Sequence, residues 1–122
     1  RLEQLVDVYL EVHRADPGLH AVIAERRASD PAIASVLEHS EAEAVRRFEA
    51  ALEEAGHPGD RQAVAFLMFA LLEGAVHAHV LSRPILDDGR LRGGLVDALL
   101  ALAAPPASRR APLARPQEGP SR

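Results

Sequence analysis

Residues 65–81 read AFLMFALLEGAVHAHVL, and this stretch decides the fold because it is long enough for a helix yet apolar on every side. At about 100° per residue it would make roughly four and a half helical turns. A helix inside a single small domain normally keeps one polar side. Something must therefore cover this helix all round, although it also carries Glu73, His77 and His79.

Three kinds of surroundings could cover such a helix. A lipid bilayer needs about 20 apolar residues for one span, but charged groups near the centre of a span cost roughly 2.5–3.5 kcal/mol each. The other helical segments of the chain are amphipathic, so we expect no membrane partner. An ordinary monomer could instead bury the helix in its own core. We favour a helix that packs on its own domain with one side and on a second subunit with another.

The rest of the sequence indicates an all-α domain. The chain has 122 residues, of which 48% are apolar and 3% aromatic, a composition typical of a soluble helical protein. No segment alternates like a strand, and helical periodicity covers residues 1–14, 18–28, 31–55, 62–82 and 90–103. We therefore predict a bundle of about five helices over residues 1–103. Residues 104–122 are rich in Pro and Arg and are expected to form a flexible tail.

Local signals set the helix ends. Asp30 before Pro31 is a typical helix start, and Asp60 can cap the helix that follows it. Gly93-Gly94 weakens the last helix by about 1 kcal/mol per Gly relative to Ala, so we expect that helix to begin late. On the short second helix we expect the inward side chains to be Leu19, Val22 and Ile23.

Charge and cysteine content exclude several classes of function. The chain has no cysteine, which rules out disulfides and thiolate chemistry. Residues 1–103 hold ten Arg against seventeen Asp and Glu, a net charge of −7 that disfavours binding to nucleic acid. All fourteen basic residues are Arg, which hints at a GC-rich bacterial gene. The chain begins directly before a helical pattern, without Met or a signal peptide, so we expect part of a longer, cytoplasmic protein.

The apolar helix carries a strip of small residues. Ala70, Gly74 and Ala78 are spaced by four, so another helix can approach this strip closely. The leucine face of the last helix is the natural second element of a four-helix bundle made by two chains. The dimer interface is therefore predicted to contain Ala63, Leu67, Ala70, Gly74, Ala78, Leu81, Leu95, Leu99 and Leu102. The alternative is that Gly74 packs against a bulky residue of its own chain.

A second sector of the same helix predicts a small-molecule pocket. Glu73 and His77 are four residues apart and can pair, which a buried carboxylate requires. Phe66 and Phe69 share this sector, so the pair would form one polar corner of an apolar cavity. From the other helices, the candidates that complete the wall are Tyr9, His13, Leu37 and Phe48. A buried Glu–His pair without a ligand is the alternative.

We predict no catalytic, metal or cofactor site. His77 and His79 are two residues apart on a helix and point away from each other, while Glu73 with His77 supplies only two ligands. The sequence holds no Gly-rich phosphate loop and no nucleophile elbow. We therefore expect that the protein is not an enzyme. A distant alternative is a helical enzyme in which Glu73 and His77 act as acid and base.

The order of the segments resembles a known family. FALLEGAVHAHVL (69–81), SRPILDDGRL (82–91) and LVDALLAL (95–102) resemble the last two core helices of the tetracycline-repressor (TetR) family of bacterial transcription regulators. YLEVHRADPGLHAVI (9–23), a helix, a Pro turn and a short helix, is similar to the effector-binding domain of that family. The resemblance covers about residues 1–103.

The resemblance implies a protein of two parts. An N-terminal helix-turn-helix domain, absent from this chain, would bind operator DNA as a dimer. The C-terminal domain would dimerise through its last two helices and bind a small, often apolar effector. We therefore predict the ligand-sensing and dimerisation domain of a TetR-like regulator, a repressor that its effector releases from DNA. The alternative is a stand-alone helical homodimer that acts as a scaffold or small-molecule carrier.

Overall fold

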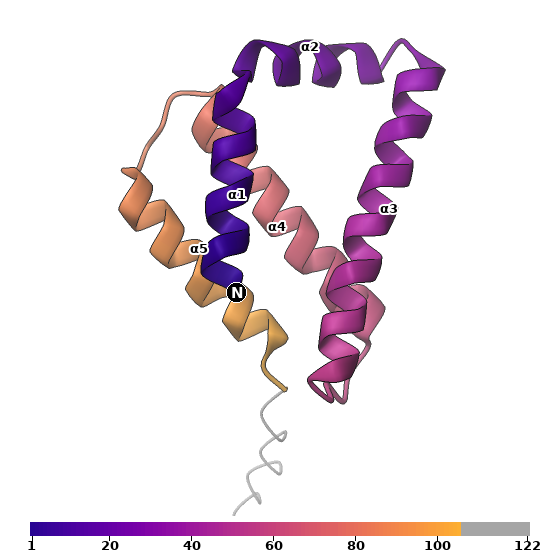
Figure 1. Ribbon diagram of the computed structural model, residues 1–122, viewed down its shortest axis with the longest axis vertical. Helices are drawn as coiled ribbons and strands as arrows, with labels where there is room; N and C mark the ends of the chain where they lie inside the picture. Colours follow the sequence, from indigo (N-terminus) through magenta and orange to yellow (C-terminus); the bar gives the residue numbers. More distant parts are fainter. Residues whose placement is uncertain (106–122) are drawn as a thin grey trace, which may run out of the picture.

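The computed structural model describes residues 1–105 and confirms the all-α fold with five helices. They are α1 (Leu2–Ala15), α2 (Pro17–Arg27), α3 (Pro31–Glu54), α4 (Arg61–Leu81) and α5 (Asp88–Ala103) (Figure 1). The predicted segments agree with these helices to within about two residues at every end. Residues 106–122 of the expected tail lie outside the described part of the chain.

Aspartates cap four of the five helices. Each accepts a hydrogen bond of 2.9–3.0 Å from a backbone N–H in the turn that follows: Asp16, Asp30, Asp60 and Asp87. Such a cap satisfies one of the N–H groups that a helix leaves without an internal partner, and it typically stabilises the helix by about 1 kcal/mol. The caps predicted at Asp30 and Asp60 are confirmed.

The last helix begins earlier than we expected. α5 starts at Asp88 and contains Gly93 and Gly94, because the cap at Asp87 fixes the first turn ahead of them. A Cβ atom at either glycine would meet no atom within 4 Å, so the packing of the described chain does not require glycine there.

A glycine turn reverses the chain between α3 and α4. Gly56 has a φ of +69°, a conformation that glycine adopts without strain. Its N–H donates to the carbonyl of Glu53, and the N–H of His57 donates to the carbonyl of Leu52, both at 2.9 Å. These two bonds form a Schellman motif, which ends α3 and directs α4 back along it.

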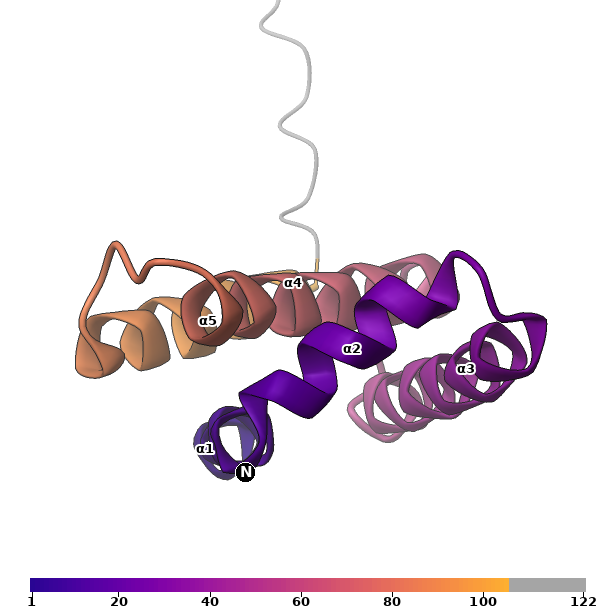
Figure 2. The same cartoon turned by 90° about the horizontal axis from the view of Figure 1, so that it is seen from above.

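Two layers of helices enclose the core. α4 and α5 form one layer, α1 and α3 form the other, and α2 crosses at one end (Figure 2). α4 contacts all four other helices. The core consists of buried apolar residues, of which α4 supplies the largest share: Val6, Leu10, Leu52, Ala65, Met68, Leu72, Val76, Leu95 and Leu99. The apolar helix singled out in the sequence is thus the centre of the domain.

By length and composition α4 could also cross a membrane, and it is the one such helix within residues 1–105. A single candidate is weak evidence, because the core helices of soluble proteins have the same composition. Here Leu72 and Val76 are fully buried by their own chain, as expected of a core helix.

The orientation of α2 differs from the prediction. Leu19 and Val22 are about half exposed, whereas His20 and Ile23 are partly buried. The reason is that α2 lies across the end of the bundle, where only a narrow side of it meets the other helices (Figure 1).

Ion pairs tie α5 to the two helices beside it. Asp88 accepts hydrogen bonds from Arg14 of α1 and, at 2.7 Å, from His79 of α4. The hydrogen bonds from Arg14 and then His79 lower the pKa of Asp88 to about 2. Arg92 donates to both carboxylate oxygens of Asp7 at 2.6 and 2.9 Å, which lowers the pKa of Asp7. These pairs fix α5 against α1 along its first two turns.

Replacing Asp88 with Asn should destabilise the fold at neutral pH and have little effect in acid. The folded pKa of about 2 lies below the ordinary value of 3.8. The ionised carboxylate therefore stabilises the fold above about pH 4, and this contribution is lost as the pH falls toward 2. Urea titrations should show a lower free energy of unfolding for Asp88→Asn at pH 7 and a shrinking difference below pH 4. The control is Glu11→Gln, an exposed acid on α1; equal effects of the two substitutions would contradict the prediction.

Candidate functional site

One side of the α4–α5 layer points away from the other helices and is largely apolar. In residues 1–105 no helix covers this side, which we call the outward face (Figure 2). The two helices of this layer expose three large apolar side chains, since Phe66, Leu67 and Leu100 are 58%, 50% and 53% exposed. Its other exposed residues are small or polar: Ala63, Ala70, Gly74 and Ala78 of α4, and Gly93, Gly94, Asp97 and Ala101 of α5.

The α4 half of the predicted dimer interface lies on the outward face. Ala63, Leu67, Ala70, Gly74 and Ala78 are exposed, and Leu81 is partly buried. A Cβ atom at Gly74 would meet no atom within 4 Å, so this glycine does not pack against a bulky residue of the described chain. The surface is therefore open to another molecule.

The α5 half of that prediction is corrected by the structure. Leu95 and Leu99 are 4% and 0% exposed, because the leucine face of α5 packs into the core of its own domain against α1 and α4. Leu102 is partly buried against the same core. The side of α5 that shares the outward face carries Gly93 and Gly94 instead.

A cavity of about 610 Å³ lies between α1 and α3. Apolar side chains from three helices form most of its wall: Leu2, Leu5, Tyr9, Ala44, Phe48, Leu52 and Met68. Exposed charged residues also line it, among them Arg1, Glu43 and Arg47. Its size and its mixture of an apolar wall with a few polar groups are typical of small-molecule sites.

The structure brings only part of the predicted pocket to this cavity. Tyr9 and Phe48 line it, but Leu37, Phe66 and Phe69 are not among its lining residues, and Phe66 is exposed. The sector that holds Phe66 and Phe69 lies at the border between the core and the outward face. In the first turns of α4 this sector is therefore exposed. Other helices cover only the part of the sector near Glu73.

Tyr9 gives the cavity a neutral hydrogen-bonding group. Burial raises the pKa of its phenol, the charge of Glu73 raises it further, and Arg47 opposes both. The phenol therefore stays protonated at neutral pH and can donate a hydrogen bond to a bound molecule.

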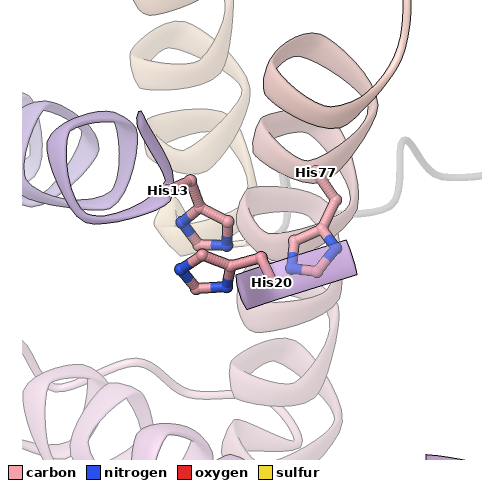
Figure 3. Close-up of side chains that lie close together, drawn as sticks. All are labelled: His13, His20 and His77. Atoms are coloured by element: carbon pink, nitrogen blue, oxygen red, sulfur yellow. The ribbon is translucent and has the colours of Figure 1, made fainter. Parts of the chain in front are cut away.

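Glu73 and His77 form the predicted pair, but with histidines from two other helices beside it. The carboxylate Oε1 of Glu73 lies 2.7 Å from Nε2 of His77 and 3.6 Å from Nε2 of His13. The ring of His20 stacks on that of His13 with centroids 4.3 Å apart, and the ring of His77 stands edge-on to His13 at 4.7 Å (Figure 3). We call His13, His20 and His77 the histidine cluster.

One nitrogen of this cluster has no hydrogen-bond partner within residues 1–105. Nδ1 of His13 donates to the carbonyl of Tyr9 at 2.7 Å, and since a carbonyl only accepts, the proton must sit on Nδ1. In the neutral ring Nε2 then carries a lone pair; this atom is buried without a hydrogen bond among the described residues, and Oε1 of Glu73 lies 3.6 Å from it. Leaving a buried polar atom unpaired costs about 1–3 kcal/mol.

A protein-family model described as "Tetracyclin repressor-like, C-terminal domain" matches residues 1–102. The chain belongs to this family. No curated protein and no solved structure matches it significantly. The membership confirms the resemblance found in the sequence, and it identifies the chain as a ligand-binding and dimerisation domain of a regulator.

Two features of this TetR-like domain were missed in the sequence. Met68 is not among the predicted pocket residues, yet it lines the cavity. His20 is the second, because the apolar Leu19 and Val22 predicted a different inward side for α2. The signal was the tight turn at Asp16-Pro17, which brings the start of α2 back to the end of α1, where His13 lies.

The phenol of Tyr9 should titrate above the ordinary value of 10.0 while the domain remains folded. Tyr9 is the only tyrosine and the chain has no Trp, so ultraviolet absorbance at rising pH reports this group alone. Glu73→Gln should lower the pKa and Arg47→Gln should raise it, because their charges act in opposite directions. Glu25→Gln, an exposed acid on α2, is the control; a folded protein with an ordinary phenol pKa would overturn the partly buried placement of Tyr9.

Proposed function

We propose that this domain is the homodimeric effector sensor of a cytoplasmic TetR-like repressor, and that a small, largely apolar effector binds in the cavity between α1 and α3. One observation carries the proposal: α4 takes part in both surfaces, since Met68 lines the cavity and Gly74 lies on the outward face. A helix that meets the effector on one side and a second subunit on another can connect the two. Operator DNA would be bound by a separate domain, because this chain is acidic.

The composition of the outward face supports dimerisation. Monomeric soluble proteins seldom expose large contiguous apolar patches. Gly93 and Gly94 each cost α5 about 1 kcal/mol relative to Ala, and nothing in the described chain packs closely enough to require them. A second copy of the chain would supply the reason, because glycine and alanine let helix backbones approach closely. The α4 and α5 helices of two chains would then form a four-helix bundle.

The lining of the cavity supports an apolar effector with one polar group. Leu5, Phe48 and Met68 offer an apolar wall, and Tyr9 offers a neutral donor within it. A hydrogen-bond acceptor on the effector, such as a carbonyl or ether oxygen, would match that donor. The charged residues that line the cavity are exposed and therefore keep contact with water.

The proposed mechanism is a shift between two packings of the helices. The effector would favour the packing in which α1 and α3 close on it, and the opposite packing would favour binding to the operator. The operator affinity can then fall by no more than the ratio of effector affinities for the two packings.

Gly74→Leu should convert a dimer into a monomer without unfolding it. Wild type should show twice the chain mass in light scattering at micromolar concentration, because the outward faces of two chains pair. The new side chain has free space within its own chain, and leucine favours a helix over glycine, so circular dichroism should remain helical. Ala42→Leu, an exposed position on α3, should leave the mass unchanged. A monomeric wild type, or a dimeric Gly74→Leu variant, would contradict the proposed interface.

An apolar dye should raise the melting temperature of wild type by binding in the cavity, and Ala44→Leu should abolish the shift by filling it. Phe69→Ala should leave the shift intact, because Phe69 is not among the lining residues. Ala42→Leu again serves as the control, since it adds the same bulk outside the cavity. Equal dye shifts in Ala44→Leu and Ala42→Leu would exclude this cavity as the binding site.

The gene sequence upstream of Arg1 separates the proposal from its rival. A basic three-helix segment with a helix-turn-helix pattern would support the repressor. A start codon or an unrelated domain there would favour a stand-alone homodimeric carrier or scaffold that uses the same cavity and interface.

A further inference from the structure

The histidine cluster joins three helices that are separate in the sequence. His13 lies in the last turn of α1, His20 in the first turns of α2, and His77 in the second half of α4. One ring nitrogen from each of the three residues lies within 4.8 Å of the others, and Figure 3 shows the three rings close together. Half of the six histidines in the chain therefore meet at one point.

His13 is already arranged as a metal-binding histidine would be. Its Nδ1 donates to the Tyr9 carbonyl at 2.7 Å, which fixes the ring, and in the neutral imidazole a lone pair remains on Nε2. Histidines that bind metals usually donate their other N–H to a carbonyl or carboxylate in this way. The side chain is only 5% exposed, and its Nε2 has no hydrogen-bond partner in the described chain.

We propose that His13, His20 and His77 bind a divalent transition-metal ion, with Zn²⁺ as the best match. Three neutral imidazoles are a common ligand set for zinc, which leaves the fourth position to water or to another ligand. Imidazole nitrogens favour zinc and its transition-metal neighbours over Mg²⁺ and Ca²⁺, which prefer oxygen. The ligand nitrogens, which lie within 4.8 Å of one another, need to approach by up to about 1.5 Å, since ligands held about 2.0–2.1 Å from a tetrahedral ion lie roughly 3.3 Å apart. The ring of His20 also has to turn out of its stacking on His13, because the lone pair of an imidazole nitrogen lies in the plane of its ring.

Glu73 supports the site electrostatically. Its carboxylate contacts both His77 and His13 and places a negative charge beside the ion. A carboxylate that contacts a metal-binding histidine orients the ring and increases its basicity. Glu73→Gln should therefore weaken metal binding without removing a histidine.

The metal would anchor the helix that is packed least firmly. α2 has no buried residue, whereas each of the other four helices has at least one. An ion bound by His20 together with His13 and His77 would hold α2 against α1 and α4. This site is separate from the proposed effector cavity, because none of the three histidines lines that cavity. The inference does not depend on the proposed function.

The test compares metal binding by untagged, metal-free wild type with that of His20→Gln. His20 is partly exposed, so this substitution removes a ligand with little effect on the core. Titration calorimetry with ZnCl₂ should give one ion per chain for wild type and an affinity at least about tenfold lower for His20→Gln. Zn²⁺ should raise the melting temperature of wild type more than that of the variant. Co²⁺ should give the strong visible absorption of a tetrahedral site in wild type and not in His20→Gln.

His39→Gln is the matched control, because His39 is an exposed histidine on α3 outside the cluster. It should bind Zn²⁺ like wild type. The melting temperatures without metal show whether any variant is misfolded, and Glu73→Gln provides a second test with all three histidines intact. Equal affinities for wild type and His20→Gln, or equal losses in His20→Gln and His39→Gln, would show that the cluster is a stack of histidines without a metal.

Discussion

The whole fold depends on how the apolar helix α4 is covered. Its Leu72 and Val76 side is fully buried by the surrounding helices, which supplies the centre of the core. Burying apolar surface contributes about 25 cal/mol per Å². A helix with apolar residues on every side therefore gains stability from each of its sides that a neighbour covers. The side with Ala70 and Gly74 has no cover within residues 1–105. The composition of α4 therefore suits a helix with two sets of neighbours, of which its own chain provides one.

The two candidate ligand sites share a single turn of α1. The side chain of Tyr9 lines the cavity, while its carbonyl accepts the hydrogen bond that orients His13 in the histidine cluster. Glu73 connects them a second time, because its charge raises the pKa of the Tyr9 phenol and its carboxylate contacts His77. A displacement of Tyr9 by a ligand would therefore change the surroundings of the cluster. The cavity and the histidine cluster are therefore connected by direct contacts between neighbouring residues.

Local signals in the sequence predicted the positions of the helices well. They did not predict which face of each helix points into the core. The start of α3 followed from Asp30 and Pro31, since capping is decided by neighbouring residues. Periodicity also showed which residues share a face of α5, but it could not show that the face with Leu95 points into its own domain. That direction depends on how α5 crosses α1 and α4. The histidine cluster was missed for the same reason, because the meeting of His20 with His77 depends on the angle at which α2 crosses the bundle.

The places where this chain departs from local rules are informative because they are confined to particular surfaces. Gly74, Gly93 and Gly94 weaken their helices, and they lie on the outward face rather than in the core. The unpaired nitrogen of His13 is buried, but it belongs to a cluster of potential ligands. Natural sequences are usually consistent across local and tertiary levels, and exceptions tend to occur at functional sites. A second subunit would give the glycines a close neighbour, and a metal ion would give the nitrogen a partner. Both departures thus become favourable once the domain is considered together with what it binds.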